Sequence, residues 1–585
     1  MRACSQPSGF SNAKEPEWID ERATGRRCFL LRLAPQVRSR RTCVTGPSPV
    51  LSIENLSIGL PALADRQHAI KDLSLTILPG ETLCVVGESG SGKSMTAMAA
   101  IGLLPPAVRV LSGTVKLGGF DLLALDEEGW CDVRGREIGM VFQEPMTSLN
   151  PVMRVADQIA ETFQAHRLLS PAERYKRAVE LLTEVNLPNP ELIARAYPHE
   201  LSGGQRQRVM IAMALALEPK LLIADEPTTA LDVTTQAQVL KLIDNLRRKK
   251  GTAVLFITHD FGVVAEIADR VAVLQNGELV EQGTADEVLH NPQHPYTNRL
   301  LAAVPSLTPP PPKELQNEPI ILKVDSLTKS YGGRGLFRKS REVQAADAVS
   351  FDIRRGETLG LVGESGSGKS TVGRCVLRLI EPDGGKIEIG SLPFSALSQA
   401  DLRPHRRKIQ IVFQDPFASL NPRRKVGYII AEGPITQGVD PAKAFEDARI
   451  LLEKVGLPAQ AAERYPHEFS GGQRQRIGIA RALAMKPDVL VADEAVSALD
   501  VSVQAEILKL LKSLQKELGL SILFITHDLR VAAQICDRVA VMQKGRIVEM
   551  AQTAQLFADP RDAYTRQLLA AVPGRARIFQ GVQNR

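Results

Sequence analysis

The sequence VGESGSGKS occurs twice in the chain, at Val86–Ser94 and at Val362–Ser370. In both loops two glycines spaced G-x4-G precede a lysine and a serine, so backbone N–H groups can turn inward around the α and β phosphates of a nucleotide. Each lysine can reach the β and γ phosphates, and each final serine can ligate Mg²⁺. The expected nucleotide-binding residues are Gly87, Glu88, Ser89, Gly90, Ser91, Gly92, Lys93 and Ser94, and Gly363, Glu364, Ser365, Gly366, Ser367, Gly368, Lys369 and Ser370.

Two acidic pairs end apolar runs of strand length, LLIAD followed by Glu226 and VLVAD followed by Glu494. Asp225 and Asp493 should therefore emerge at the carboxyl ends of strands beside the glycine loops, where a Mg²⁺ ligand must sit. The next side chain along a strand points to the other side. Glu226 and Glu494 are therefore candidates to polarise the water that attacks the γ phosphate.

The repetition extends beyond the loops. LSGGQRQRV at 201–209 returns as FSGGQRQRI at 469–477, and LFITHD at 255–260 returns at 523–528, both at an offset of 268 residues. The SGGQ elements are expected to open helices whose free N–H groups form a second anion site. Their residues are Ser202, Gly203, Gly204 and Gln205, and Ser470, Gly471, Gly472 and Gln473.

The elements that must position these residues alternate between short apolar strands and longer helical stretches, in both copies. This pattern predicts an α/β fold with a mainly parallel sheet covered on both faces. SLTPPPPKELQNEP, at 306–319, favours extended geometry and is interpreted as a semi-rigid linker. We therefore expect an N-terminal extension at 1–48, a first copy at 49–305 and a second copy at 320–585.

With the SGGQ elements beside the phosphate loops, the chain resembles the ATP-binding cassette (ABC) family from about residue 49 to its end. The resemblance implies two fused ABC-type P-loop ATPase domains, each with a parallel sheet core and a helical signature subdomain. It also implies that each ATP is held between the loop of one copy and the signature of the other. This explains why one chain needs two loops, and fusion raises the effective concentration of each half for the other.

The resemblance assigns further residues. Gln143 and Gln414 resemble the glutamines that touch Mg²⁺ and the attacking water, and His259 and His527 resemble the switch histidines that contact the γ phosphate. The ALD words at 230–232 and 498–500 resemble the loops that link the two sites. With Ser94, Asp225, Ser370 and Asp493, the two glutamines complete the expected Mg²⁺ ligands. Because each copy carries a full set, both sites should hydrolyse ATP.

The two copies differ at two positions of the pattern. Tyr331 stands where the family places an aromatic residue that stacks on adenine, but the aligned residue of the first copy is Leu60, with His68 as a weak substitute. Ala495 stands where the first copy has Pro227. Adenine stacking is therefore expected in the second site only.

Short sequence motifs indicate which branch of the ABC family the chain resembles. FQEPMTSLNP, FQDPFASLNP and NPQHPYTNRLLAAVP resemble the ATPases that drive bacterial uptake of peptides, glutathione and nickel, and the last word returns as DPRDAYTRQLLAAVP. The resemblance implies two integral-membrane permease subunits, a periplasmic solute-binding protein and a place on the cytoplasmic face of the inner membrane. Because two fused copies with these motifs most resemble the ATPases of glutathione import, glutathione or short peptides are the expected cargo, and nickel or opine-like solutes are the alternative.

The distribution of charge argues against a nucleic-acid partner. Residues 1–50 carry nine basic and four acidic residues, +5 of the net +6, so the remaining chain is near neutral and no nucleic-acid partner is expected. We interpret 1–48 as a basic disordered extension or an artefact of an early start codon, with a targeting arm as the alternative. No run is apolar for the ~18–20 residues of a membrane span.

Two other classes fit less well. A soluble twin-cassette translation factor remains an alternative, but such proteins join their cassettes by a long charged helix, unlike the PPPP linker. No CxxC pair exists for the zinc sites of DNA-repair cassettes. No cysteine lies between Cys131 and Cys375 or after Cys536, so we expect no iron–sulfur cluster after the HPYT word.

Overall fold

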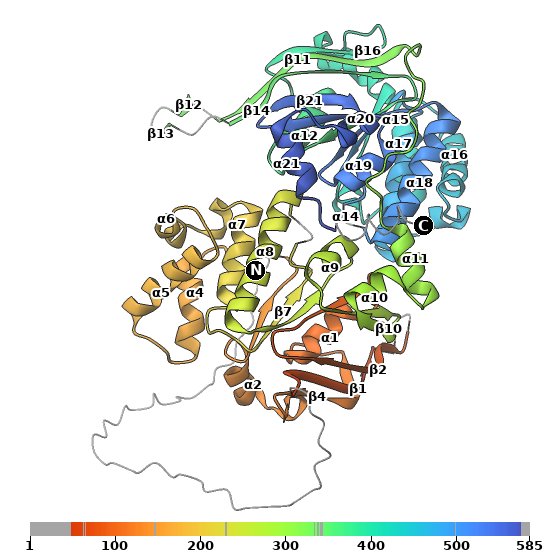
Figure 1. Cartoon of the computed structure of the whole chain (residues 1–585). Helices are drawn as coiled ribbons and strands as arrows, with labels where there is room; N and C mark the ends of the chain where they lie inside the picture. Colours follow the sequence, from red (N-terminus) through yellow and green to blue (C-terminus); the bar gives the residue numbers. More distant parts are fainter. Residues whose placement is uncertain are drawn as a thin grey trace, which may run out of the picture. The chain divides into compact units, whose positions relative to one another are not determined.

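The computed structural model describes residues 48–574, except for Leu63, Asp65, 145–147, 229–230, 333, 336–337, 340–342 and 498 (Figure 1). The predicted extension at 1–48 thus lies outside the described residues, apart from its last position. The described residues belong to one compact unit. Among them, no helix is both long enough and apolar enough to cross a membrane.

The first copy is built on a six-stranded sheet in the order β10-β9-β3-β8-β7-β6, in which only β10 is antiparallel to its neighbour. Strands β3, β7 and β8 are buried at every position, as continuous apolar strands must be when helices cover both faces. The strands are β3 Thr82–Val86, β6 Ile138–Val141, β7 Leu221–Asp225, β8 Ala253–Ile257, β9 Arg270–Gln275 and β10 Glu278–Thr284.

The second copy repeats this sheet with the same order, β21-β20-β15-β19-β18-β17, and the same antiparallel edge. Its strands are β15 Thr358–Val362, β17 Ile409–Val412, β18 Val489–Asp493, β19 Ser521–Thr526, β20 Arg538–Gln543 and β21 Arg546–Gln552. The prediction of a mainly parallel α/β fold in both copies is confirmed.

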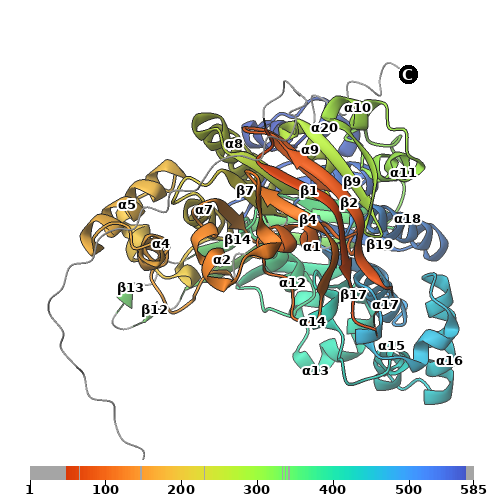
Figure 2. The same ribbon diagram turned by 90° about the horizontal axis from the view of Figure 1, so that it is seen from below.

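Each copy also has an antiparallel sheet that the sequence analysis did not anticipate. The first has the order β2-β1-β4-β5 and the second the order β14-β11-β16. In the first copy α1, at Lys93–Ala100, packs against β2 on one side and against β7 and β8 on the other, so it lies between the two sheets (Figure 1). Seen from below, strands β1, β2 and β4 cross in front of the first copy (Figure 2). These strands are β1 Leu51–Gly59, β2 His68–Ile77, β4 Arg109–Leu117, β5 Phe120–Asp121, β11 Ile320–Tyr331, β14 Val343–Arg354 and β16 Gly384–Ile389, with a small β12 Arg334–Gly335 and β13 Arg338–Lys339 pair.

A helical subdomain carries the signature in each copy, formed by α4 to α7 in the first and α15 to α17 in the second (Figure 1). Local sequence explains where these helices begin. Helix α5 starts with Pro171 after a capping box between Ser170 and Glu173, and α16 starts with Pro441 after Asp440. The helices are α4 Val155–Ala165, α5 Pro171–Glu184, α6 Pro190–Arg195, α7 Gly203–Ala214, α15 Val426–Thr436, α16 Pro441–Lys454 and α17 Gly471–Leu483.

The other helices cover the sheets and close each copy. In the first copy they are α1 Lys93–Ala100, α2 Glu127–Val133, α8 Val233–Lys250, α9 Phe261–Ile267, α10 Ala285–His290 and α11 Pro295–Ala303. In the second they are α12 Lys369–Val376, α13 Gln399–Leu402, α14 Pro416–Ser419, α18 Val501–Leu518, α19 Leu529–Ile535, α20 Thr553–Ala558 and α21 Ala563–Ala570. Short 3-10 turns lie at 122–124, 198–200, 394–396, 403–408, 459–463 and 466–468.

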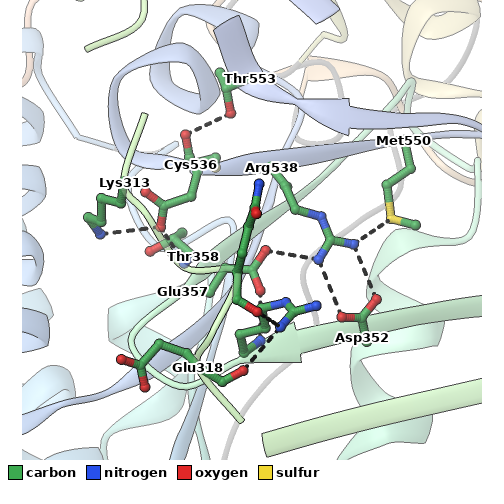
Figure 3. A network of polar contacts seen from close by, with 12 residues as sticks. Lys313, Glu318, Asp352, Glu357, Thr358, Cys536, Arg538, Met550 and Thr553 are labelled. Atoms are coloured by element: carbon green, nitrogen blue, oxygen red, sulfur yellow. Dashed lines mark hydrogen bonds and ion pairs between the residues drawn. The ribbon is translucent and has the colours of Figure 1, made fainter. Parts of the chain in front are cut away.

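The segment between α11 and β11 contains no helix or strand in its described residues 304–319. It lies against the second copy (Figure 3): Lys313 Nζ is 3.2 Å from Asp537 Oδ2, and Arg354 Nη1 donates to the carbonyl oxygens of Gln316, at 2.7 Å, and Glu318, at 3.1 Å. This segment is therefore docked along its length, whereas its prolines alone predicted only an extended tether.

The lysine of this segment takes over a contact that the first copy makes internally. There, Arg247 Nη1 lies 2.8 Å from Asp269 Oδ2. At the equivalent positions the second copy has Gln515 and Asp537, and Gln515 donates to Thr358 Oγ1 instead. Lys313 supplies the cation that Gln515 lacks.

Candidate functional site

The two glycine loops adopt the same conformation, each between a buried strand and a helix. Lys93 Nζ donates to the carbonyl oxygens of Gly87, at 2.8 Å, and Glu88, at 2.9 Å, and Lys369 makes the same contacts in the second copy. Gly92 and Gly368 precede the helices with φ of 105°, and a Cβ at Gly368 would lie 1.9 Å from the carbonyl oxygen of Ala345. Only glycine fits there, and the loop leaves helix N–H groups facing outward.

A pocket of about 520 Å³ opens over the second loop. Its volume lies within the range of roughly 300–1,000 Å³ that is usual for small-molecule sites. It brings together most of the residues predicted for the second site: the lining includes Tyr331, Ser365, Gly366, Gly368, Lys369, Ser370, Gln414, Glu494 and His527. The arrangement can hold a triphosphate on the loop with an aromatic ring at one end.

A hydroxyl and a carboxylate meet beside each loop. Ser94 Oγ donates to Asp225 Oδ1 at 3.1 Å, and Ser370 Oγ donates to Asp493 Oδ1 at 2.9 Å. Burial raises the pKa of Asp225 to about 6, although the Ser94 hydrogen bond opposes that rise. Burial likewise raises the pKa of Asp493. An anion held at such cost favours a cation beside it, and these oxygen donors are the kind that Mg²⁺ prefers.

The glutamate after each strand is held from two sides. Glu226 Oε2 accepts from Gln143 Nε2 at 3.0 Å, and Glu226 Oε1 lies 3.2 Å from His259 Nδ1. Its φ of 45° is rare for a residue with a side chain, and such backbone strain concentrates at functional sites. The predicted glutamine, glutamate and histidine of the first copy therefore come together.

The second copy repeats this cluster. Glu494 Oε2 accepts from Gln414 Nε2 at 2.7 Å, and Glu494 Oε1 lies 3.4 Å from His527 Nδ1. Burial alone would raise the pKa of Glu494, but His527 and its other partners hold it below its ordinary value. The contact with the glutamate likewise outweighs burial and raises the pKa of His259 and of His527. Glu494 is thus an ionised proton acceptor at neutral pH.

The SGGQ elements open helices, as predicted. Ser202 caps α7 in a capping box with Gln205, and Ser470 caps α17 with Gln473. Both side chains are therefore used at the helix start, and the outward anion site is left to the first N–H groups of the helix. The second glycine is required by packing, because a Cβ at Gly204 would lie 2.5 Å from Thr235 Cγ2.

Residues of each copy approach the loop of the other. Ser502 Oγ, at the start of α18, donates to Glu88 Oε1 of the first loop at 2.6 Å. The carboxylate of Asp232 acts on the pKa of Lys369, and that of Asp500 acts on the pKa of Lys93, although burial dominates and lowers both lysine pKa values. The predicted linking loops thus face the opposite sites, while Ala230 and Ala498 lie outside the described residues.

The difference at the adenine end is visible in the structure. Tyr331 is 41% exposed and lines the second pocket. Leu60 instead packs against the core of the first copy. Arg66 donates to the carbonyl oxygen of Gly90 in the first loop, a contact that sequence reasoning missed.

Two tyrosines that were not predicted as site residues support the loops. Tyr296 Oη accepts from Glu88 N at 3.1 Å, and Tyr564 Oη accepts from Glu364 N at 3.2 Å. Burial raises the pKa of both to about 12, so both are neutral hydroxyls at neutral pH. A signal existed in the sequence: HPYT becomes DAYT in the second copy, and only the Tyr-Thr pair is kept.

Comparison with known proteins decides the family. The model of the ABC transporter family matches residues 70–229 and 346–497. This chain belongs to the ABC transporter family. A second family model, described as "Oligopeptide/dipeptide transporter, C-terminal region", matches residues 280–334 and 548–577. This ABC transporter chain is thus an ATP-binding, ATP-hydrolysing subunit, which works peripherally at a membrane with permease subunits.

Close relatives of this ABC transporter chain carry one name. "Glutathione import ATP-binding protein GsiA" of Shigella dysenteriae is 50% identical over 558 residues, which cover 90% of this chain and 89% of the relative. The protein of that name from Escherichia coli K12 is 49% identical with the same coverage. The solved dimeric structure of the ATP-binding cassette MJ0796 in a post-hydrolysis state with ADP and Pi is 30% identical, covers 40% of this chain and 98% of its own, and has a TM-score of 0.36.

Proposed function

We propose that this chain is the motor of an importer for glutathione or short peptides, and that both of its sites hydrolyse ATP. The name shared by relatives at 49–50% identity supports glutathione, and the matched C-terminal regions support the wider peptide class. The observation that carries the motor chemistry is the glutamate held between a glutamine and a histidine in both copies.

The proposed reaction uses this glutamate as a general base. A water molecule placed in line with the γ phosphate donates its proton to the carboxylate of Glu226 or Glu494 as its oxygen attacks the γ phosphorus. The bond from that phosphorus to the β–γ bridging oxygen breaks, and ADP and inorganic phosphate leave. The glutamine amide and the histidine ring fix the carboxylate, so little reorganisation is needed in the transition state. Lys93 and Lys369 hold the β and γ phosphates, and the first N–H groups of the signature helices meet the same phosphates from the other copy.

The residues beside each loop fit Mg²⁺ by the chemistry of their donors. Ser94, Asp225 and Gln143 would hold the ion in the first site, and Ser370, Asp493 and Gln414 would hold it in the second. A bound Mg²⁺ would neutralise charge on the β and γ phosphates. The Ser–Asp contacts at 3.1 and 2.9 Å support this assignment, because they keep both oxygens at one point beside the loop.

The proposed partners follow from import. Two permease subunits would form the channel, a periplasmic solute-binding protein would deliver the cargo, and the chain would bind the cytoplasmic face of the inner membrane. ATP binding favours the closed arrangement of the two copies and hydrolysis favours the open one, so the differential binding moves the permease. The contacts between the copies, such as Ser502 to Glu88, support closure around nucleotide.

Uptake of labelled glutathione, beside a labelled dipeptide, tests this proposal in cells that carry the wild-type chain or Glu226→Gln/Glu494→Gln. Loss of a general base costs about 10²- to 10⁴-fold in rate, so uptake of the true cargo should fall to background. Glu128→Gln, an exposed glutamate in the first turn of α2, is the matched control and should retain uptake.

The pattern of loss identifies the cargo. A fall in glutathione uptake alone supports a glutathione importer, and a fall in dipeptide uptake alone supports a peptide importer. If neither falls, the proposed cargo is wrong, and nickel and opine-like solutes become the substrates to assay.

A further inference from the structure

Arg530, in the first turn of α19, joins the two copies. Its Nη1 donates to Asp260 Oδ1 at 2.8 Å and its Nη2 donates to Asp260 Oδ2 at 2.9 Å, although the two residues are 270 positions apart. The same Nη2 lies 3.3 Å from Oδ2 of Asp528 in its own copy. We propose that Arg530 is a positioning residue that couples the two ATP sites through their switch histidines.

Arg530 contacts two carboxylates, and each belongs to the residue immediately after a switch histidine in the sequence. Asp260 follows His259, and Asp528 follows His527. Each histidine lies within 3.4 Å of the glutamate of its own site. A continuous path therefore leads from Glu226 through His259, Asp260, Arg530, Asp528 and His527 to Glu494.

The contact is built to transmit a displacement. The exposed fractions of the Arg530 and Asp260 side chains are only 10% and 17%, and two parallel N–H···O bonds fix their relative orientation. Burial disfavours the Asp260 anion, but the guanidinium holds its pKa at about 2. Breaking such a pair leaves a buried charge unpaired, which is costly. The loops after β8 and β19 should therefore move together.

The arrangement accepts only one arginine. The position equivalent to Arg530 in the first copy is Gly262, and a Cβ on Gly262 would lie 2.6 Å from Arg530 Nη1 and 2.9 Å from the backbone carbonyl oxygen of Pro573. One guanidinium thus serves both aspartates, and the two ATP sites are joined by a part that belongs to the second copy only.

Neighbouring contacts hold this interface in place. Gly574 N, after α21 of the second copy, donates to Glu266 Oε1 of α9 in the first copy at 3.0 Å. Conversely, Gln534 Nε2 of α19 donates to the carbonyl oxygens of Ser306, at 2.8 Å, and Thr308, at 2.9 Å. The ends of α9 and α19 are therefore each fixed by a segment that follows the C-terminal helix of the other copy.

The test measures how much the second site influences ATP binding at the first. In the full chain, a non-hydrolysable ATP analogue prevents turnover and leaves both glutamates of the path intact, and the Kd of the analogue at the first site is compared with and without Lys369→Ala. Coupling between sites is commonly about 5- to 150-fold. We expect Lys369→Ala to weaken the first site at least ~5-fold when Arg530 is present and less than ~2-fold in Arg530→Met.

Matched variants separate coupling from stability. Arg538→Met also removes partly buried ion pairs, with Asp352 and Glu357, but all of these lie in the second copy (Figure 3), so it should preserve the coupling. If Arg530→Met fails to fold, Asp260→Asn replaces it, since asparagine still caps α9.

The outcome is decisive in either direction. Equal coupling in Arg530→Met and in the unchanged background, or no coupling in that background, would overturn the proposal. The inference rests on the proposed sites, and these fail separately: a chain that binds no ATP even with both lysines intact would refute the sites themselves.

Discussion

The hydroxyl of Tyr296 offers a way to loosen the first phosphate loop without touching the reacting groups. In Tyr296→Phe the buried ring, 3% exposed, can stay in place while Glu88 N loses its acceptor at 3.1 Å. Glu88 is partly exposed, so water can partly replace the hydroxyl. The cost is therefore that of a net hydrogen bond, about 0.5–1.5 kcal/mol, which corresponds to about a 2- to 12-fold weaker ATP affinity.

The assay is ATP binding at the first site in a chain whose second site is disabled by Lys369→Ala. Tyr564→Phe, tested with Lys93→Ala, should weaken the second site by a similar factor, because Tyr564 Oη accepts from Glu364 N at 3.2 Å. Tyr428 lies in α15 and its ring contacts the guanidinium of Arg424, so Tyr428→Phe is the control and should leave both affinities unchanged. An unchanged first-site affinity in Tyr296→Phe would refute the support that we assign to the hydroxyl.

Three further outcomes are expected. Lys93→Ala alone should cut ATPase activity sharply, because both sites are needed, and near-normal turnover would contradict this. The raised pKa of His259 means that its protonated form stabilises the fold below its ordinary pKa of 6.5 and that this stability is lost as pH rises through the folded pKa. The Tm of the wild type should therefore exceed that of His259→Gln most at about pH 6 and least at about pH 8.5, whereas a constant gap would exclude titration as the cause. Lys313→Met should lower the Tm of the second copy by about 1–3 °C, since half-exposed ion pairs contribute little. Adding Gln515→Arg should recover this Tm, because the arginine supplies the cation for Asp537, as Arg247 does for Asp269. Failure of that recovery would show that the ion pair is not what docks the segment.

The residues recognised from sequence are those whose chemistry is set locally. A glycine loop between an apolar strand and a helix, or a carboxylate pair after an apolar run, has its geometry determined within a few positions. Asp225 does end β7, and the glutamine, glutamate and histidine meet as the family resemblance implied. The two antiparallel sheets were missed because their strands are only half buried and carry no comparable local pattern.

Contacts between distant segments were also beyond sequence reasoning. Tyr296 lies 208 positions from Glu88, Lys313 lies 224 from Asp537, and Arg530 lies 270 from Asp260. A single sequence does not show which of many tyrosines, lysines and arginines meets a given partner. Comparison of the two copies with each other held part of the answer, because Lys313 and Arg530 both act where the copies differ.

The pair Gly262 and Arg530 bears on how such a chain could have evolved. In a dimer of identical cassettes both positions hold the same residue, by symmetry. Two glycines make no bridge, and a second arginine would begin with a Cβ 2.6 Å from the first guanidinium. A bridge made by one arginine therefore became accessible only after gene duplication allowed the two positions to diverge. Fusion into one reading frame then guarantees one partner of each kind at every synthesis, so neither half can be inherited, expressed or replaced without the other.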